Sequence, residues 1–332
     1  MPPAPALPVI PLIDLGTAGL DELARRLPER LALLSAAGRR QSTTAGLALM
    51  DWRSRRWLRR NETPYRAEIA AIAALPGAFG VHALNISTEW ACTTAVAGGR
   101  LVRTLDWPLV GLGREVVVAR REGPAGPWYG VTWPGFVGTL TGMAPGRFAA
   151  AYNQAPIRRV TGAKPLDWLV ERAKVGGRTA LPAVHLLRRV FETCGDFDAA
   201  LAALRDTPIA LTALFSLAGA DGRAAIVERT ETRAFVHPGP GAVPNQWLTP
   251  ELEGYPRGVD SPGRLGQACG LLPDLAGLAP DFAWLRYPML NHFSRLAVIA
   301  DPARGDLAVI GLERAGEIAT PATEALYLKG LG

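Results

Sequence analysis

The chain has 332 residues, of which 48% are hydrophobic, so it can bury a large core and is not globally disordered. Its formal net charge is +6, but the basic residues are spread along the chain, and we expect no nucleic-acid partner. The three cysteines lie far apart, and no Cys–His pair has zinc-ligand spacing. We therefore expect no disulfide framework, no metal and no other cofactor.

The start of the chain lacks the pattern of a signal peptide, which is a basic region followed by an apolar run. No apolar stretch reaches the length of about 18 residues that a membrane-spanning helix needs. These two observations predict a cytoplasmic protein.

The first 91 residues are predicted to be mostly helical after one opening strand. The strand covers Val9–Leu15, and its prolines suit the edge of a sheet. Pro28 predicts a kink or a break in the helix that follows. Apolar residues recur at helical spacing in three stretches, over 20–37, 43–60 and 64–75.

A cluster of arginines lies in the second of these helical stretches, between Arg53 and Arg60. Such a cluster is typical of the solvated face of a helix. It also fits a weak contact with a membrane surface or an acidic partner. We favour the solvated face and keep weak membrane contact as the alternative.

From Val81 onward the pattern changes to short strands, over 81–86, 93–97, 100–105, 115–120, 128–133, 135–143 and 147–153. Three helices follow, over 164–172, 182–193 and 196–205, and then strands over 213–218, 224–229, 233–236, 295–300 and 307–312. This order indicates an α+β fold with antiparallel sheets. The segment 238–263 is rich in Pro and Gly and is predicted to be a long functional loop.

The pair Gly98-Gly99 predicts a two-residue hairpin turn, because both central positions of such a turn need a positive φ. The turn then sets the register of the two strands, with Ala97 opposite Arg100, Thr94 opposite Arg103, and Cys92 opposite Leu105. Side chains alternate between the two faces of a strand. Cys92 and Arg103 therefore share a face as diagonal neighbours.

A guanidinium beside a thiol favours the thiolate, which is the nucleophilic form of cysteine. Asp106 is expected just past the paired region, before Trp107-Pro108. Each residue also has an ordinary interpretation: a buried core thiol, a solvated arginine and a turn aspartate. Spacing alone does not choose between these interpretations.

The run Cys92-Thr93-Thr94, followed by Arg103-x-x-Asp106-Trp107, resembles the acid ceramidase and N-acylethanolamine acid amidase group. These are N-terminal-nucleophile cysteine hydrolases related to choloylglycine hydrolases. The resemblance extends over most of the chain, to Trp133–Gly146, Phe191–Pro208, Asn245 in Pro244-Asn245-Gln246-Trp247, and Ser261-x-x-Arg264.

The resemblance implies a four-layer αββα sandwich of two antiparallel sheets, preceded by an N-terminal helical segment. It also implies that the chain cuts itself between Ala91 and Cys92, into a segment 1–91 and a catalytic segment 92–332. These fragments would be partners of each other. The freed α-amino group of Cys92 would be the general base for its own thiol.

The resemblance assigns a role to each residue of the site. Arg103 would lie near the thiolate, Asp106 would orient the amine, and Asn245 would donate a hydrogen bond to the oxyanion. Arg264 would support these residues. The implied reaction is hydrolysis of an N-acyl amide with an apolar acyl group, through a thioester of Cys92.

One segment departs from the family pattern. Asn153-Gln154-Ala155 stands where the family commonly has Asn-Glu-Arg. Gln154 can donate and accept hydrogen bonds but cannot carry a negative charge. We place Asn153, Gln154 and Trp107 at the substrate and oxyanion side of the site, with a different polar contact to the substrate.

Two alternatives remain open. An acyltransferase similar to β-lactam acyltransferases would share the thioester and pass the acyl group to an amine. An uncut homologue would bind lipid or a partner without catalysis. A Cys–His dyad is a further possibility, but the chain offers only His82, His185, His237 and His292, and their positions favour structural roles.

Overall fold

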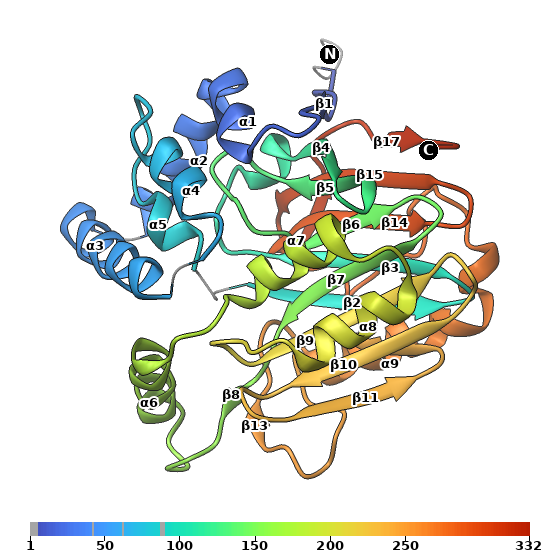
Figure 1. Ribbon diagram of the computed structural model, residues 1–332. Helices are drawn as coiled ribbons and strands as arrows, with labels where there is room; N and C mark the ends of the chain where they lie inside the picture. Colours follow the sequence, from blue (N-terminus) through green and yellow to red (C-terminus); the bar gives the residue numbers. More distant parts are fainter. Residues whose placement is uncertain (1–5, 42, 62, 87–89) are drawn as a thin grey trace.

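The computed structural model describes residues 6–41, 43–61, 63–86 and 90–332. Two β-sheets stack face to face, and helices cover their outer faces (Figure 1). Apolar side chains of both sheets fill the space between them and form the main core. The architecture is therefore the four-layer αββα arrangement that the resemblance implies.

The first sheet has eight strands in the order β1-β4-β5-β6-β7-β9-β10-β11. Neighbouring strands are antiparallel except β1 and β4, which are parallel. This one pair departs from the prediction of antiparallel sheets. The strands are β1 (Leu12–Asp14), β4 (Val117–Gly123), β5 (Gly126–Thr132), β6 (Thr141–Ala144), β7 (Phe148–Gln154), β9 (Ala213–Gly219), β10 (Ala224–Arg229) and β11 (Ala234–Pro238).

The second sheet has the order β12-β2-β3-β14-β15-β16, and β17 also pairs with β15. Its strands are β2 (Ala91–Ala97), β3 (Arg100–Asp106), β12 (Gly241–Val243), β14 (Ser294–Asp301), β15 (Asp306–Ala315), β16 (Ile318–Pro321) and β17 (Leu326–Leu328). A small separate pair joins β8 (Ile157–Arg158) to β13 (Gly254–Tyr255).

Helices α7 (Ala183–Thr193) and α8 (Phe197–Asp206) cover the outer face of the eight-stranded sheet. The Asp196 side chain caps α8 by accepting a hydrogen bond from the Ala199 amide at 2.8 Å, as its position in the sequence predicts. Helix α9 (Ser261–Leu271) and the 3-10 helix η2 (Leu272–Gly277) cover the other sheet, beside β2.

The remaining helices lie at one end of the sandwich (Figure 1). They are α1 (Leu20–Arg26), α2 (Pro28–Gln41), α3 (Thr44–Arg60), α4 (Arg66–Ala73), α5 (Val81–Leu84) and α6 (Lys164–Gly177); a short 3-10 helix, η1 (Leu112–Glu115), precedes β4. Pro28 begins α2, so the predicted break is present. Proline suits this position because the first turn of a helix leaves its amides without helical partners.

The prediction of a strand over 81–86 was wrong, because this segment contains helix α5. Gly80 precedes the helix with a φ of 71°. The Asp51 side chain, from α3, accepts hydrogen bonds from the amides of His82 (2.8 Å) and Ala83 (3.1 Å). A cap supplied from 31 residues away is invisible to local periodicity.

Two other predicted segments need correction. Of the predicted strand over 135–143, only 141–143 is a strand, as the start of β6, which ends at Ala144. The predicted loop over 238–263 contains the short strands β12 and β13 and the first turn of α9.

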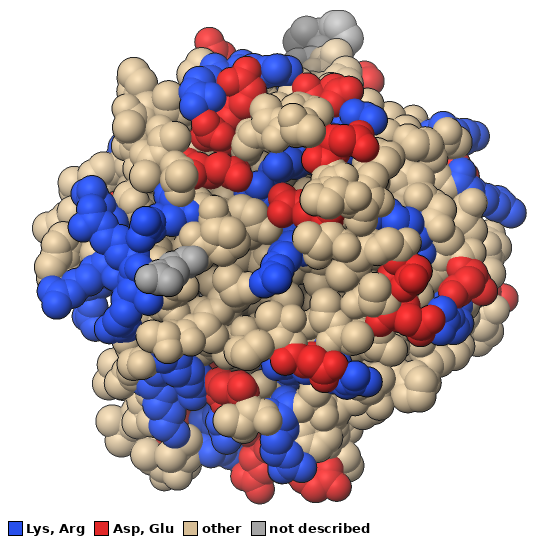
Figure 2. Space-filling view, viewed as in Figure 1, with Lys and Arg blue, Asp and Glu red and all other residues tan. Residues whose placement is uncertain are grey.

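The arginines between Arg53 and Arg60 are exposed, while Ser54, Trp57 and Leu58 are buried. Figure 2 shows basic side chains gathered over this helix, at the left of the view. Exposed Leu49, Met50 and Trp52 lie nearby. Contact with anionic lipid stays a prediction, testable by vesicle sedimentation at two salt concentrations. No helix among the described residues is both long and apolar enough to cross a membrane.

Candidate active site

The hairpin of β2 and β3 has the predicted register. Gly98 and Gly99 adopt φ values of 55° and 76°, which a two-residue turn requires. The paired positions are those predicted, and the ladder extends to Ala91 opposite Asp106. Asp106 is thus the last residue of the ladder rather than a residue beyond it.

Cys92 lies on the face of the hairpin that packs between the two sheets. Its side chain is fully buried, and Nη2 of Arg103 lies 2.8 Å from Sγ. The same nitrogen donates to the Tyr152 carbonyl at 2.6 Å. Nη1 of Arg103 donates to the Leu140 carbonyl and the Thr141 hydroxyl. The predicted neighbours are therefore in contact, and carbonyls of the facing sheet fix the guanidinium.

Burial raises the pKa of the Cys92 thiol above its usual value. The charge and the hydrogen bond of Arg103 act in the opposite direction, but burial dominates. Arg103 therefore favours the thiolate, as the sequence predicts, but in the intact chain the cost of burying the charged form is larger.

Asn245 lies just after β12 and contacts the backbone of Cys92. Its Oδ1 accepts a hydrogen bond from the Cys92 amide at 2.7 Å, and its Nδ2 donates to the Gln154 carbonyl at 2.8 Å. In the intact chain Asn245 is thus an acceptor toward Cys92. The amide nitrogen Nδ2 carries two N–H donors, so the predicted donation to an oxyanion would use the one that is not directed at the Gln154 carbonyl.

Arg264, on α9, lies on the other side of the Cys92 backbone. Its Nη1 donates to the Cys92 carbonyl at 2.7 Å, to Thr93 Oγ1 at 3.0 Å and to Asn245 Oδ1 at 3.1 Å. Burial lowers the pKa of this guanidinium, although Asp106 counteracts part of the shift. The structure therefore brings Cys92, Arg103, Asn245 and Arg264 together.

Asp106 is buried, and its carboxylate accepts hydrogen bonds from Asn291 Nδ2 and Ser294 Oγ, both at 2.8 Å. Burial raises its pKa, and the charge of Arg264 and these two donors oppose the shift. Among the described residues, the nitrogen of Cys92 is bonded to Asn245 and not to Asp106. The role of Asp106 in orienting a free amine stays a prediction.

Asn291 and Ser294 were not predicted as site residues. They lie 185 and 188 positions after Asp106, and no local motif connects them. Strand β14 begins at Ser294, which pairs with Asp106 in the ladder between β3 and β14. The predicted strand over 295–300 was the one sequence signal pointing to this neighbourhood.

Asn153 connects β7 to the strands around the site. It accepts a hydrogen bond from Thr94 Oγ1 at 2.9 Å and donates to the carbonyls of Val243 (2.8 Å) and Pro244 (3.2 Å). Asn153 therefore positions the segment that carries Asn245.

Gln154 and Trp107 line a cavity of about 940 Å³. Gln154 Oε1 accepts a hydrogen bond from the Tyr152 hydroxyl at 2.5 Å, which leaves the glutamine amino group to face other partners. An ion pair of Glu171 and Arg257, at 3.4 Å, belongs to the same lining. Most of the lining is apolar and comes from segments before and after Cys92, including Leu34, Leu47, Trp57, Leu84, Leu109 and Leu169.

Trp90 and Ala91 precede Cys92 in the chain and are buried. The Trp90 ring packs edge-on against Trp107, Phe136 and Tyr152, with ring centroids 5.0, 6.1 and 6.3 Å apart. Sequence patterns did not single out Trp90. This packing fixes the chain that leads into Cys92.

Each of the four histidines makes a contact with a residue other than Cys92. His82 contacts Asp51, His185 contacts Thr63, His237 contacts Glu228, and His292 packs on Phe293. Among the described residues, none of them contacts Cys92, so the structure contains no Cys–His dyad there. No group of three or more His, Cys, Asp and Glu side chains in the described ranges is arranged to hold a metal ion.

No protein-family model matches the chain, and no curated protein matches its sequence. Among solved structures, the Caenorhabditis elegans ortholog of N-acylethanolamine-hydrolyzing acid amidase is similar, with 18% identity and a TM-score of 0.47 over 64% of this chain and 93% of that one. This amidase belongs to the group that the Cys92 segment resembles.

Two bacterial structures are similar as well. A mutant of conjugated bile acid hydrolase from Clostridium perfringens has 10% identity and a TM-score of 0.40, over 72% of this chain and 96% of that one. Penicillin V acylase from Agrobacterium tumefaciens has 13% identity and a TM-score of 0.41, over 72% and 86%. Because these sequence identities are low, the activity and the substrate of this chain are inferred below from its own site.

Proposed function

We propose that the chain is a self-processing cysteine amidase that hydrolyses an N-acyl amide with an apolar acyl group. The observation that carries the proposal is the environment of Cys92. Its Sγ lies 2.8 Å from Arg103, and its backbone nitrogen lies 2.7 Å from Asn245 Oδ1. A cut before Cys92 would turn this nitrogen into an amine beside the thiol.

In the proposed first reaction, Sγ of Cys92 adds to the Ala91 carbonyl carbon. The bond from that carbon to the Cys92 nitrogen breaks, and the thiol proton ends on the nitrogen. Water then hydrolyses the thioester, leaving a carboxylate on Ala91 and a free amine on Cys92. An α-amine titrates near pH 7.7–8.0 in peptides, so a neutral fraction is present at physiological pH to act as a base.

In the second reaction, the amine takes the proton of the Cys92 thiol while Sγ attacks the amide carbonyl of the substrate. The C–N bond of the substrate breaks, and the leaving amine takes this proton. Water hydrolyses the resulting thioester and releases the acid. Arg103 lies beside Sγ and lowers the energy of the thiolate. Asn245 Nδ2 would donate to the developing oxyanion, a contact worth about 10²- to 10³-fold in rate.

The acyl group of the substrate is inferred from the cavity beside the site. Its volume of about 940 Å³ and its mainly apolar lining suit a hydrocarbon chain. Trp107 and Gln154 belong to the lining. Trp107 follows Asp106 in the chain, and the Gln154 carbonyl accepts a hydrogen bond from Asn245. Gln154 gives the substrate a neutral polar contact rather than a carboxylate.

The test is to trap the acyl-enzyme. Fluorogenic amides of saturated acids of increasing length are mixed with the protein. The reaction is quenched in acid, and the masses of the protein fragments are measured by mass spectrometry. We expect one acyl group on the fragment that begins with Cys92, with the highest turnover for long chains. Turnover without this adduct would contradict a Cys92 thioester.

The same experiment separates hydrolysis from acyl transfer. With a competing amine present, an amidase releases mainly the free acid, whereas an acyltransferase converts the acyl group into a new amide. A folded protein that binds acyl chains but shows neither product would be the non-catalytic homologue.

A further inference from the structure

The buried loop between β5 and β6 ends at a contact with Arg103. The loop covers residues 133–140, and all of them are buried although none belongs to a strand. The Leu140 carbonyl and the Thr141 hydroxyl that follows it accept hydrogen bonds from Nη1 of Arg103. Nη2 of the same guanidinium lies 2.8 Å from Cys92 Sγ. The position of this loop therefore helps to determine where the guanidinium lies beside the thiol.

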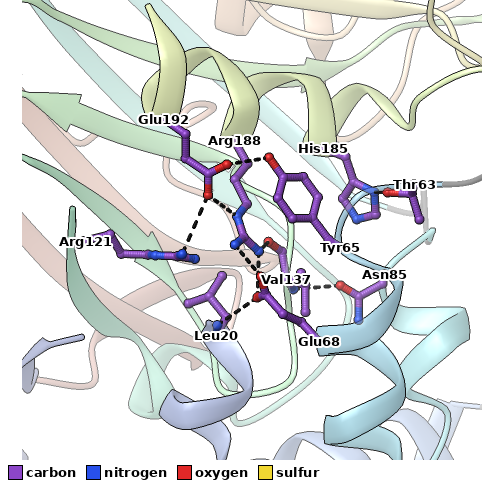
Figure 3. Close-up of polar contacts among 10 residues, drawn as sticks. All are labelled: Leu20, Thr63, Tyr65, Glu68, Asn85, Arg121, Val137, His185, Arg188 and Glu192. Carbon is purple, nitrogen blue, oxygen red and sulfur yellow. Dashed lines mark hydrogen bonds and ion pairs between the residues drawn. The ribbon is translucent and has the colours of Figure 1, made fainter. Parts of the chain in front are cut away.

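Two buried side chains hold the middle of this loop through the backbone of Val137 (Figure 3). Asn85 Oδ1 accepts a hydrogen bond from the Val137 amide at 2.7 Å. Arg188 Nη1 donates to the Val137 carbonyl at 3.1 Å. Arg188 is itself fixed, because its two terminal nitrogens donate to the Glu68 carboxylate at 2.8 and 2.7 Å. Both polar groups of the Val137 backbone are therefore held by side chains from other elements.

Asn85 follows α5 and uses both ends of its amide. Besides accepting from Val137, it donates through Nδ2 to the carbonyls of Gly135 and Val81, both at 2.9 Å. Asn85 therefore connects the loop to helix α5. Without its side chain, the Val137 amide and the Gly135 carbonyl would lose these partners inside the protein, and a buried polar group without a partner is costly.

The far end of the loop has backbone contacts of its own. The Thr139 amide donates to the Val184 carbonyl at 3.0 Å, and the Tyr152 amide donates to the Leu140 carbonyl at 2.9 Å. These contacts do not involve Asn85. We therefore expect the loss of Asn85 to shift the loop against the guanidinium without unfolding it. A shift of about 1 Å at a reacting group can lower a rate about 100-fold.

We propose that Asn85 is a positioning residue, which holds the loop 133–140 so that Arg103 keeps its guanidinium beside Sγ of Cys92. The inference rests on the proposed function, in which Arg103 lowers the energy of the thiolate. A displaced guanidinium would leave a weaker nucleophile. Among the described residues, Asn85 is not part of the cavity lining, so substrate binding is expected to stay nearly unchanged.

The test compares the turnover of a fluorogenic N-acyl amide by wild type and by Asn85→Ala, per mole of cut protein. We expect kcat to fall about 10- to 100-fold, with KM changed less than about 2-fold. Asn85→Asp keeps the shape of the side chain and the acceptor for the Val137 amide. It is therefore expected to retain more of kcat than Asn85→Ala.

Asn61→Ala is the matched control. Like Asn85, Asn61 accepts a hydrogen bond from a distant amide, that of Ala180 at 2.6 Å, and donates to a carbonyl, that of Trp57 at 2.9 Å. Neither partner belongs to the loop 133–140. Asn61→Ala is expected to lower stability and to leave kcat unchanged.

NMR of the arginine side-chain nitrogens observes Arg103 directly and needs no activity. A guanidinium held in place gives separate signals for its two Nη atoms, and a freely rotating one gives a single signal. The signals of Arg103 are assigned by their loss in Arg103→Lys. We expect separate signals in wild type and Asn61→Ala, and merged signals in Asn85→Ala. If wild type is uncut or inactive, the proposed function fails, and these spectra still test the positioning.

A double-mutant cycle shows whether Asn85 acts through Arg103. If it does, Asn85→Ala lowers kcat less in the Arg103→Lys protein than in wild type, so the two effects do not add. Additive effects would overturn the proposal. So would unchanged Arg103 signals in Asn85→Ala, or an equal loss of kcat in Asn61→Ala.

Discussion

At the scale of single residues, Cys92 shows how burial and a neighbouring charge compete. Arg103 lies 2.8 Å from Sγ, as the alternation of side chains predicted. Burial nevertheless raises the pKa of the thiol, so proximity to a cation does not by itself make a thiolate. The proposed amine supplies the missing base at the same residue, which explains why no histidine is needed beside Cys92.

The residues found by sequence were those with a local signal. The strands that carry Cys92 and Arg103 are joined by a two-residue turn, and a short turn fixes which residues of the two strands face each other. Asn245 and Arg264 could be found only through resemblance. Asn291 and Ser294 were missed because their contact with Asp106 depends on the pairing of β3 with β14, which no spacing in the chain encodes.

His185 makes stability depend on pH. Burial lowers its pKa from the ordinary 6.5 to about 3, with Arg188 acting in the same direction. The unfolded chain therefore binds the proton more readily between these values, and stability is lost as the pH falls below 6.5. Between pH 7 and 5, we expect uncut Cys92→Ala to lose about 2 kcal/mol through this group.

The check is urea unfolding of the uncut Cys92→Ala protein, with and without His185→Gln. Glutamine cannot take up a proton, so the variant is expected to lose less stability between pH 7 and pH 5. His292→Gln is the control, because His292 is only partly buried and packs on Phe293. An unchanged pH dependence in His185→Gln would contradict the assignment.

At the scale of elements, the β2–β3 hairpin was predictable and helix α5 was not. In the hairpin, the Gly-Gly turn and the alternation of side chains both specify one register. The run over 81–86 is too short for its periodicity to distinguish a strand from a helix. Its helix is selected by Asp51, which caps the amides of His82 and Ala83.

Gly99 is predicted to be intolerant of a side chain for two reasons. Its φ is 76°, and a Cβ there would lie 2.9 Å from the Gly219 carbonyl oxygen of the facing sheet. Gly146 has a similar φ of 71° with nothing within 4 Å of a Cβ. Gly146→Ala should cost about 1–2 kcal/mol from backbone strain, and Gly99→Ala should cost more.

Urea unfolding of both alanine variants in the uncut Cys92→Ala protein tests this difference. The larger loss in Gly99→Ala would measure the close packing of the hairpin on the first, eight-stranded sheet. Equal losses in the two variants would mean that the sheets separate enough to accept the methyl group.

At the scale of the whole molecule, the segment before Cys92 and the segment after it fold as one unit. Among the described residues, the first supplies β1, helices α1 to α5, part of the cavity lining and Glu68, which accepts a hydrogen bond from Arg188 of the second. The α+β class was predictable from the order of strands and helices, and its four layers followed from the resemblance. The parallel pairing of β1 with β4 was not, because it joins the opening strand to one more than a hundred residues later.

The central claim is that Cys92 becomes the first residue of a new chain, and the mass of the denatured protein tests it directly. We predict that the purified wild type gives two fragments divided between Ala91 and Cys92, and that Cys92→Ala gives one uncut chain. A folded wild type that remains a single polypeptide of 332 residues would contradict the account, because Cys92 would then have no amine to act as its base.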